Sequence, residues 1–294
     1  MSRGGGSGDV TRRTLLGWGM GAIGGSALAA CSAPPVAPVS KPTTSPAPSA
    51  GTTLRPQPTA AAPPVAVEIE PPPPPLQPVP ALARVPAPYG TIDSLPGEGS
   101  LLAWTVDDGL NGEVIRAYAA FAAATGVRLT LFVTGMYSGW DESAGALAPL
   151  IASGQVQLAN HTWSHADLTT LDDAGVAGEL QGAHDFIADV FGVDARPFWR
   201  PPFGFHDERV DSIAADLGYT VPTLWYGSLS DSGEIPGPLI VDFARQWFLP
   251  QHIVIGHLNC LPVTTVFEEL QALVIERGLT TVTLNDVFSS EYHP

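Results

Sequence analysis

Short apolar runs alternate with helix-like patterns over the last two thirds of this chain of 294 residues. Residues 101–106 are nearly all apolar, as expected for a strand that is buried on both faces. Residues 113–125 follow with apolar side chains at helical spacing and end at Gly126. The same order repeats as far as 280–283, the last predicted strand. Such repetition predicts an α/β fold, with a parallel sheet and helices outside it.

Residues suited to chemistry lie at the ends of four predicted strands. The other strands are predicted at 127–133, 156–159, 196–199, 219–225 and 252–255, and the other helices at 144–153, 172–191, 208–217, 240–248 and 266–277. Asp107 and Asp108, His161, Arg200 and His257 each come within two residues of a strand end. Because the carboxyl ends of parallel strands converge on one face, we expect these side chains to form one site. The pattern alone does not show closure into a barrel.

Two histidines in the sequence Asn-His-Thr-Trp-Ser-His, His161 and His165, have the spacing of metal ligands. On a single helical turn, this spacing can place both imidazoles on one side. A catalytic zinc ion takes about three protein ligands and keeps one position for water. The best source of the third ligand is Asp107-Asp108-Gly109. Alone, the histidine pair is a moderate signal, and Asp-Asp-Gly is typical of an ordinary turn.

Two further motifs follow in the chain: Arg-Pro-Pro-Phe-Gly from Arg200, and Ile-Gly-His ending at His257. In this order, the four motifs resemble those of the polysaccharide deacetylase family, the carbohydrate esterases of family four. The resemblance extends over about 101–288. It implies a distorted barrel of about seven parallel strands, with a metal site at the carboxyl ends of the strands.

The resemblance assigns a metal centre and a base. It implies that Asp108, His161 and His165 bind the metal, whereas Asp107 accepts a proton from the attacking water and Arg200 pairs with this base. One carboxylate and two imidazoles suit zinc (Zn2+) or another divalent transition metal such as cobalt (Co2+) better than magnesium or calcium.

The resemblance also assigns the groups that would act on the acyl carbon and the leaving group. It implies that the Phe203 backbone N–H stabilises the oxyanion and that His257 protonates the leaving group. Asp231 is the candidate for orienting His257, although the Trp that usually follows this aspartate is missing. For His257, the alternative is a buried core histidine.

The expected substrate contacts depart from the family pattern. Leu110 stands where the first motif usually continues with Pro, and Ile255 replaces the usual Leu as the residue expected to line an acetyl pocket. We expect Trp163, Trp199 and Trp225 near the site, where they would suit sugar rings. Tryptophans at strand ends are nevertheless more often part of the core.

The N-terminal part predicts export and anchoring. Arg12 and Arg13, a short Gly- and Ala-rich apolar stretch and Leu-Ala-Ala-Cys resemble a twin-arginine signal over 1–30 with a lipid attached to Cys31. A generic positively charged signal start is the alternative. Residues 31–88 contain 19 of the 30 prolines and predict a disordered, extended tether. The catalytic domain is then expected over 89–294, on the outer face of the bacterial cell membrane.

Charge limits the partners of the predicted domain. From Tyr89 onward, seven arginines and no lysine stand against 26 Asp and Glu. Such a domain is repelled by nucleic acid and by anionic lipids, so we expect membrane contact only through the lipid anchor. With Cys31 lipidated, Cys260 has no disulfide partner and is expected to be a small buried residue. A ligand role for it beside His257 is the minor alternative, and we expect a monomer.

The motifs favour a metal-dependent hydrolase that deacetylates N-acetylated amino sugars in a cell-wall or extracellular polysaccharide. An O-acetyl esterase acting on xylan or a similar glycan would use the same groups, because both reactions pass through the same oxyanion. The third hypothesis is a catalytically silent glycan-binding lipoprotein. It is disfavoured because Asp107, His257 and the three metal ligands are all present.

Overall fold

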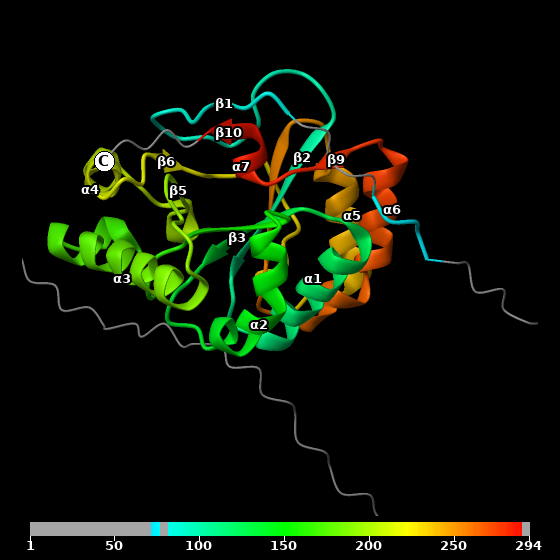
Figure 1. Cartoon of the computed structure of the whole chain (residues 1–294), viewed down its shortest axis with the longest axis horizontal. Helices are drawn as coiled ribbons and strands as arrows, with labels where there is room; N and C mark the ends of the chain where they lie inside the picture. Colours follow the sequence, from blue (N-terminus) through cyan, green and yellow to red (C-terminus); the bar gives the residue numbers. More distant parts are fainter. Residues whose placement is uncertain (1–71, 77–81, 290–294) are drawn as a thin grey trace, which may run out of the picture. The chain divides into compact units, whose positions relative to one another are not determined.

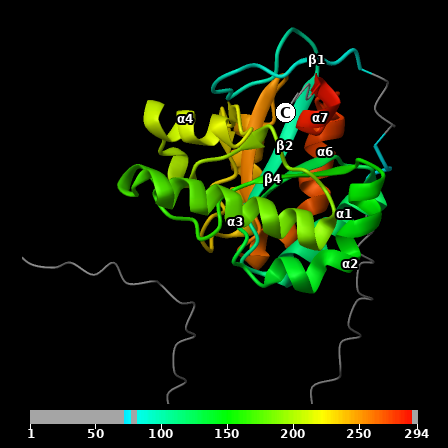
Figure 2. The same ribbon diagram turned by 60° about the vertical axis from the view of Figure 1, so that its left-hand side comes forward.

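The computed structural model describes residues 72–76 and 82–289. The predicted signal 1–30, Cys31 and most of the predicted tether lie outside these residues, so what the sequence indicates for them stays a prediction. The described residues build an α/β structure around a parallel sheet (Figure 1 and Figure 2).

Seven strands follow one another across this sheet, and all neighbouring pairs are parallel. In spatial order they are β6 (Val221–Pro222), β5 (Phe198–Trp199), β4 (Val156–Asn160), β3 (Leu129–Val133), β2 (Leu101–Asp108), β8 (His252–His257) and β7 (Gly227–Ser228). An eighth strand, β9 (Thr280–Thr281), pairs with the start of β2. The sheet curls into a half-barrel (Figure 1). The predicted fold class, a distorted barrel of about seven parallel strands, is confirmed.

Helices connect the strands and cover the outside of the sheet (Figure 2). They are α1 (Gly112–Thr125), α2 (Gly139–Ala152), α3 (Asp173–Phe191), α4 (Glu208–Asp216), α5 (Gly237–Trp247), α6 (Phe267–Glu276) and the short α7 (Leu284–Val287). Local signals explain their limits. Asn111 caps α1 by accepting a hydrogen bond from the Glu113 N–H, and Gly126 ends this helix in the left-handed conformation.

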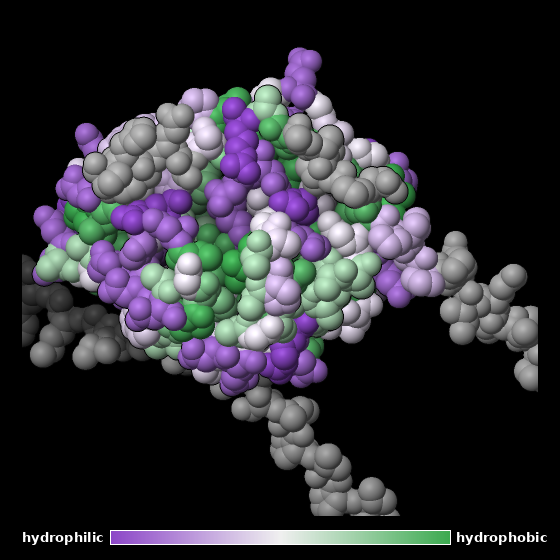
Figure 3. Space-filling view, in the orientation of Figure 1, coloured by the Kyte–Doolittle hydropathy of each residue, from purple (hydrophilic) through white to green (hydrophobic). Residues whose placement is uncertain are grey.

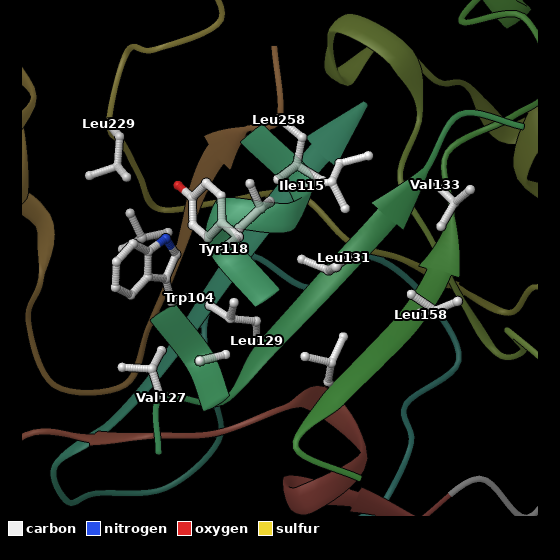
Figure 4. Packing of buried hydrophobic residues seen from close by; sticks show 14 of the residues in the cluster. Trp104, Ile115, Tyr118, Val127, Leu129, Leu131, Val133, Leu158, Leu229 and Leu258 are labelled. Atoms are coloured by element: carbon white, nitrogen blue, oxygen red, sulfur yellow. The ribbon is translucent and has the colours of Figure 1, made fainter. Parts of the chain in front are cut away.

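Strand β2 is buried on both faces, as its apolar sequence predicts. On the side of the helices, Trp104 packs edge-on against Tyr118 of α1, with ring centroids 6.1 Å apart (Figure 4). On the other side, Ala103 belongs to a second buried cluster together with Phe132 and Ile253. This double burial fixes the position of β2, and with it the position of the two aspartates at its end.

Ordered contacts begin before Tyr89, inside the segment that the sequence assigns to the tether. Strand β1 (Val85–Pro86) pairs in parallel with β10 (Phe288–Ser289). Farther back, the Leu76 N–H donates to Thr125 O at 2.6 Å, and Gln271 Nε2 donates to Pro74 O at 2.8 Å. None of these contacts is predicted from local sequence pattern, because each joins segments far apart in the chain.

Hydrophilic and apolar residues are interspersed on the face of the molecule that Figure 3 shows. Among the described helices, none is long and apolar enough to cross a membrane.

Candidate metal centre and active site

The two neighbouring aspartates at the end of β2 reach the same site. In regular extended chain, neighbouring side chains point to opposite faces. Asp108, however, has a φ of 78°, in the left-handed region. As a result, Oδ2 of Asp107 and Oδ1 of Asp108 each lie 3.5 Å from Nε2 of His161. The Asp108 carbonyl holds this bend, since it accepts hydrogen bonds from the Thr134 N–H at 3.1 Å and from the Trp140 indole at 2.8 Å.

His161 and His165 approach Asp108 from the loop that follows β4. Thr162 and His165 have φ values of 70° and 62°, so the expectation of a single helical turn is wrong. The loop still brings the two imidazoles together. Nε2 of His165 lies 3.4 Å from Oδ1 of Asp108, and the ligand atoms of these three residues all lie within 4.8 Å of one another.

The three groups fit a metal ion because their free electron pairs face one another. The Nδ1–H of His161 donates to Arg200 O at 2.7 Å, which leaves Nε2 unprotonated. Burial lowers the pKa of His161 to about 3, although the charge of Asp108 opposes this effect. Oδ1 of Asp108 is buried and has no hydrogen-bond partner among the described residues. One cation of the zinc type would satisfy all three groups.

Side chains around the triad hold the ligands in place. Asn259 Nδ2 donates to Oδ2 of Asp108 at 2.6 Å and so leaves only Oδ1 for a metal. Ser164, between the two histidines, donates to Glu179 of α3 from its N–H at 2.7 Å and from its hydroxyl at 2.6 Å. Neither Asn259 nor Glu179 is among the site residues predicted from the sequence. For Asn259, a signal existed, because this polar residue follows the β8 histidine by two positions.

Arg200 is fully buried and holds Asp107. Its Nη1 donates to Oδ1 of Asp107 at 2.5 Å and to the Thr105 hydroxyl at 3.0 Å. Its Nε donates to Thr223 O at 2.8 Å, and its guanidinium lies 4.0 Å from the centre of the Phe132 ring. Burial raises the pKa of Asp107 above its usual value, and the charge of Arg200 is the main opposing effect. The predicted pairing of these two residues is present.

The buried Asp231 and the partly buried His257 form a second pair. Nδ1 of His257, at the end of β8, lies 3.0 Å from Oδ1 of Asp231, and Asp231 is 2% exposed. Burial alone would lower the pKa of His257. The hydrogen bond and the charge of Asp231 overcome this effect, so the pKa is raised above 6.5. The neighbour predicted for His257 is therefore in place, without the Trp of the family pattern.

Phe203 lies in a tight turn, the 3-10 helix Pro202–Gly204, with a φ of 60°. In this turn, the N–H groups of Gly204 and Phe205 donate to Pro201 O and Pro202 O. The Phe203 ring is 58% exposed and meets the His165 ring edge-on, with centroids 4.7 Å apart.

A cavity of about 330 Å³ joins these groups. It is lined by Asp107, Asp108, His161, His165, Pro201, Phe203, Trp225, Ser228, Ser232, Ile255 and His257. Ile255 and Trp225 thus lie where substrate contacts were expected. Trp163 is not part of this lining and packs instead against Gly182 and Phe186 of α3. Trp199 is completely buried in the core, so it offers no surface to a sugar.

Comparison with known proteins supports the interpretation of the motifs. The family model "Polysaccharide deacetylase" matches residues 95–222. A chitin deacetylase from Arthroderma benhamiae is 27% identical over 210 residues, which cover 68% of this chain and 54% of that protein. The chain matches only 14% to 54% of the length of the first five curated relatives.

Solved structures share the fold. A peptidoglycan N-acetylglucosamine deacetylase, 18% identical, aligns with a TM-score of 0.62 over 70% of this chain and 95% of the other. A CE4 family pseudoenzyme from Bacillus anthracis, 16% identical, aligns with a TM-score of 0.61 over 69% and 70%. At such identities, the likeness shows the fold alone. The family model and the curated relatives show similarity in sequence to polysaccharide deacetylases over part of this chain.

Proposed function

We propose that this chain is a metal-dependent enzyme that removes N-acetyl groups from the amino sugars of a cell-wall or extracellular polysaccharide. The observation that carries the proposal is the meeting of three units at one cavity: the Asp108–His161–His165 triad, Asp107 held by Arg200, and His257 held by Asp231. Relatives named as chitin and peptidoglycan-N-acetylglucosamine deacetylases support N-acetylated amino sugars as the substrate class.

Asp108, His161 and His165 would hold the metal, zinc or another divalent transition metal such as cobalt. When bound, the metal would supply Lewis acidity that polarises the acetyl carbonyl and makes a water molecule more acidic. The Asn259 side chain keeps Oδ2 of Asp108 engaged, so that Oδ1 remains the ligand atom. The Nδ1–H of His161 is bound to Arg200 O, which presents Nε2 to the ion.

Asp107 accepts the proton of the attacking water. Arg200 occupies its Oδ1, and the free Oδ2 faces the triad, 3.5 Å from Nε2 of His161. Oδ2 is therefore the atom that takes the proton while the water oxygen bonds to the acetyl carbon. The ion pair with Arg200 keeps the carboxylate in this orientation.

His257 and Phe203 complete the reaction. Nδ1 of His257 is bound to Asp231, so Nε2 carries the proton that is given to the sugar nitrogen as the carbon–nitrogen bond breaks. The backbone N–H of Phe203 donates to the oxyanion, and one such donor typically lowers a barrier by about 3–4 kcal/mol. Acetate and a free amine are the products.

The N-terminal residues suggest where the enzyme works. We place it outside the cell, held to the bacterial membrane by a lipid on Cys31 after twin-arginine export, with the proline-rich segment as a spacer. This part of the proposal rests on the sequence alone.

The experiment that tests the activity is acetate release by the full chain, zinc-loaded and chelated. The substrates are an N-acetylglucosamine oligomer and acetylated xylan, so that amide and ester hydrolysis are compared directly. Asp107→Asn is the control, because it removes the base but keeps all three metal ligands. His161→Ala should lose both zinc and activity.

We expect acetate release from the N-acetylglucosamine oligomer. This release should depend on zinc and should be absent in Asp107→Asn. Faster release from xylan would make the chain an O-acetyl esterase. No release from either substrate, with one zinc still bound, would contradict the enzymatic proposal and favour a glycan-binding role. A Bacillus anthracis protein described as a CE4 family pseudoenzyme shares this fold.

A further inference from the structure

Exposed large apolar side chains gather at the end of the sheet that carries the metal ligands. Twelve such side chains are present in the described residues, and six of them lie in loops that follow five strands of the sheet. Their exposed fractions range from 40% to 60%. We call these six residues the apolar rim: Leu110, Met136, Trp163, Phe203, Phe205 and Leu261. Exposed apolar side chains that gather in one place mark a binding surface, whereas single scattered ones do not.

The apolar rim follows the order of the strands. β8, β2, β3, β4 and β5 are successive neighbours in the sheet, and the loop after each of them carries at least one rim residue. The loops after β2 and β4 also belong to the metal triad, so the rim borders the catalytic centre. Tyr226 follows β6, but its ring lies 4.4 Å from that of His252 at the amino end of β8. The exposed apolar residues outside the rim are Val85, Tyr89, Tyr226, Leu239, Leu249 and Ile275.

Hydrogen bonds between neighbouring loops hold the rim in place. The Met136 N–H donates to Trp163 O at 2.9 Å, which joins the loops after β3 and β4. The Leu110 N–H donates to Oδ1 of Asn259 at 3.4 Å, which joins the loops after β2 and β8. A surface that is already ordered loses little conformational entropy when it binds a partner.

The rim is continuous with the catalytic cavity through Phe203. This residue lines the cavity, and its ring meets the His165 ring on one side, as described above. On the other side lies the ring of Phe205, with centroids 5.9 Å apart. A molecule that reaches the cavity can therefore contact the rim at the same time, so the occupant of the rim is expected to be the substrate itself.

Charge narrows the chemistry of this occupant. Three of the five loops, 109–111, 134–138 and 258–266, contain no Asp, Glu, Lys or Arg. They belong to a domain in which 26 acidic residues stand against seven arginines. An uncharged apolar surface in such a domain fits a neutral partner, whereas anionic lipids are repelled. Neutral sugar rings have apolar faces of C–H groups, and packed glycan chains display many such faces side by side.

We propose that the apolar rim binds the surface of packed, insoluble chains of a neutral glycan, so that the enzyme adsorbs to the solid while one sugar enters the catalytic cavity. The rim residues contact the chains beside the one that is deacetylated, and the burial of apolar surface from both partners provides the affinity. This inference rests on the proposed function for the reaction in the cavity. It predicts that the rim matters for a solid substrate and not for a short soluble one.

The test uses the zinc-loaded full chain with particulate chitin, a packed polymer of N-acetylglucosamine, and with the soluble N-acetylglucosamine trimer. Met136→Gln/Phe205→Gln/Leu261→Gln replaces three exposed rim side chains without adding charge. This triple variant should adsorb to the particles about 10- to 100-fold more weakly than the wild type. At low particle concentration it should release acetate more slowly by a similar factor, whereas kcat and KM for the trimer should stay unchanged.

The matched control is Leu239→Gln/Leu249→Gln/Ile275→Gln, which changes three exposed apolar residues outside the rim. This variant should adsorb like the wild type, and urea denaturation should show that both triple variants remain folded. Equal adsorption of the two triple variants would overturn the proposal. A loss of trimer turnover as large as the loss on particles would also overturn it, because the rim would then belong to the site for a single chain.

Two further outcomes separate this proposal from its alternatives. Vesicles of phosphatidylcholine, with and without phosphatidylglycerol, test a membrane as the occupant. Binding to vesicles but not to chitin, if it is lost in the rim variant, would overturn the glycan surface in favour of a lipid surface. Adsorption to chitin that depends on the rim but is followed by no acetate release would contradict the proposed function, while the binding surface would stand.

Discussion

Asn259 donates a hydrogen bond of 2.6 Å to Oδ2 of Asp108, and this contact decides which oxygen of the carboxylate faces the two histidines. Oδ1 is left without a hydrogen-bond partner in the described structure, 3.4 Å and 3.5 Å from the imidazole nitrogens of His165 and His161. Asn259 thus orients a ligand without being one, as residues behind metal ligands commonly do.

Asn259→Ala should weaken zinc binding by about 10- to 100-fold, because the Asp108 carboxylate becomes free to rotate. Competition with a chromophoric chelator measures this change directly. Asn285→Ala is the matched control, since this asparagine lies on α7, away from the motifs, and should leave zinc affinity unchanged. Equal affinity in the wild type and in Asn259→Ala would show that the hydrogen bond does not orient the ligand.

Arg200→Met should lower the free energy of unfolding by about 3–5 kcal/mol, because Asp107 would remain buried without its partner. Urea denaturation of chelated protein measures the loss. The double variant Arg200→Met/Asp107→Asn carries no unpaired charge at this position, so it should recover part of the stability. A double variant less stable than Arg200→Met alone would mean that the ion pair is not the reason for the loss.

The sequence predicted those parts of the site that depend on strand ends. Apolar runs located the strands, and parallel pairing then brought Asp107, His161, Arg200 and His257 to one edge of the sheet. Each of these positions follows from local pattern together with the general geometry of parallel sheets.

The remaining features depend on tertiary contacts that no local pattern contains. Five of the six described non-glycine residues with positive φ lie in the segments that build the site: Asp108, Thr162, His165, Phe203 and Ser230. Such conformations are disfavoured locally and persist because the surroundings hold them, so the loop form of the histidine pair was not predicted. The contact of Trp163 with α3 was missed for the same reason.

Asp231→Asn should reverse the way in which His257 makes stability depend on pH. In the wild type, the His257 pKa is raised above 6.5, so its contribution is fully present below about pH 6.5 and is lost as the pH rises through the raised value. In the variant, burial dominates and the pKa falls. The gap in unfolding free energy between the two proteins should therefore narrow as the pH rises, and urea denaturation at several pH values measures it. If the difference in unfolding free energy between the two proteins stayed constant or widened as the pH rises, this would argue against a charged Asp231–His257 pair.

Uncharged glycans should be better substrates than glycans that carry carboxylates. Of the seven arginines after Tyr89, Arg277 donates hydrogen bonds to main-chain carbonyls. The other six form ion pairs with carboxylates: Arg116, Arg128, Arg196, Arg200, Arg209 and Arg245. The excess of acidic residues is thus left to repel an anionic polymer.

At low salt, kcat/KM should be lower for an N-acetylated glycan bearing carboxylates than for a neutral N-acetylglucosamine oligomer. Added sodium chloride should narrow the difference, because about 0.15 M salt already screens charges beyond about 8 Å. The neutral oligomer, which carries no charge to screen, is the control and should respond little to salt. An anionic substrate that is turned over as fast at low salt as the neutral one would show that local contacts outweigh the charge of the domain.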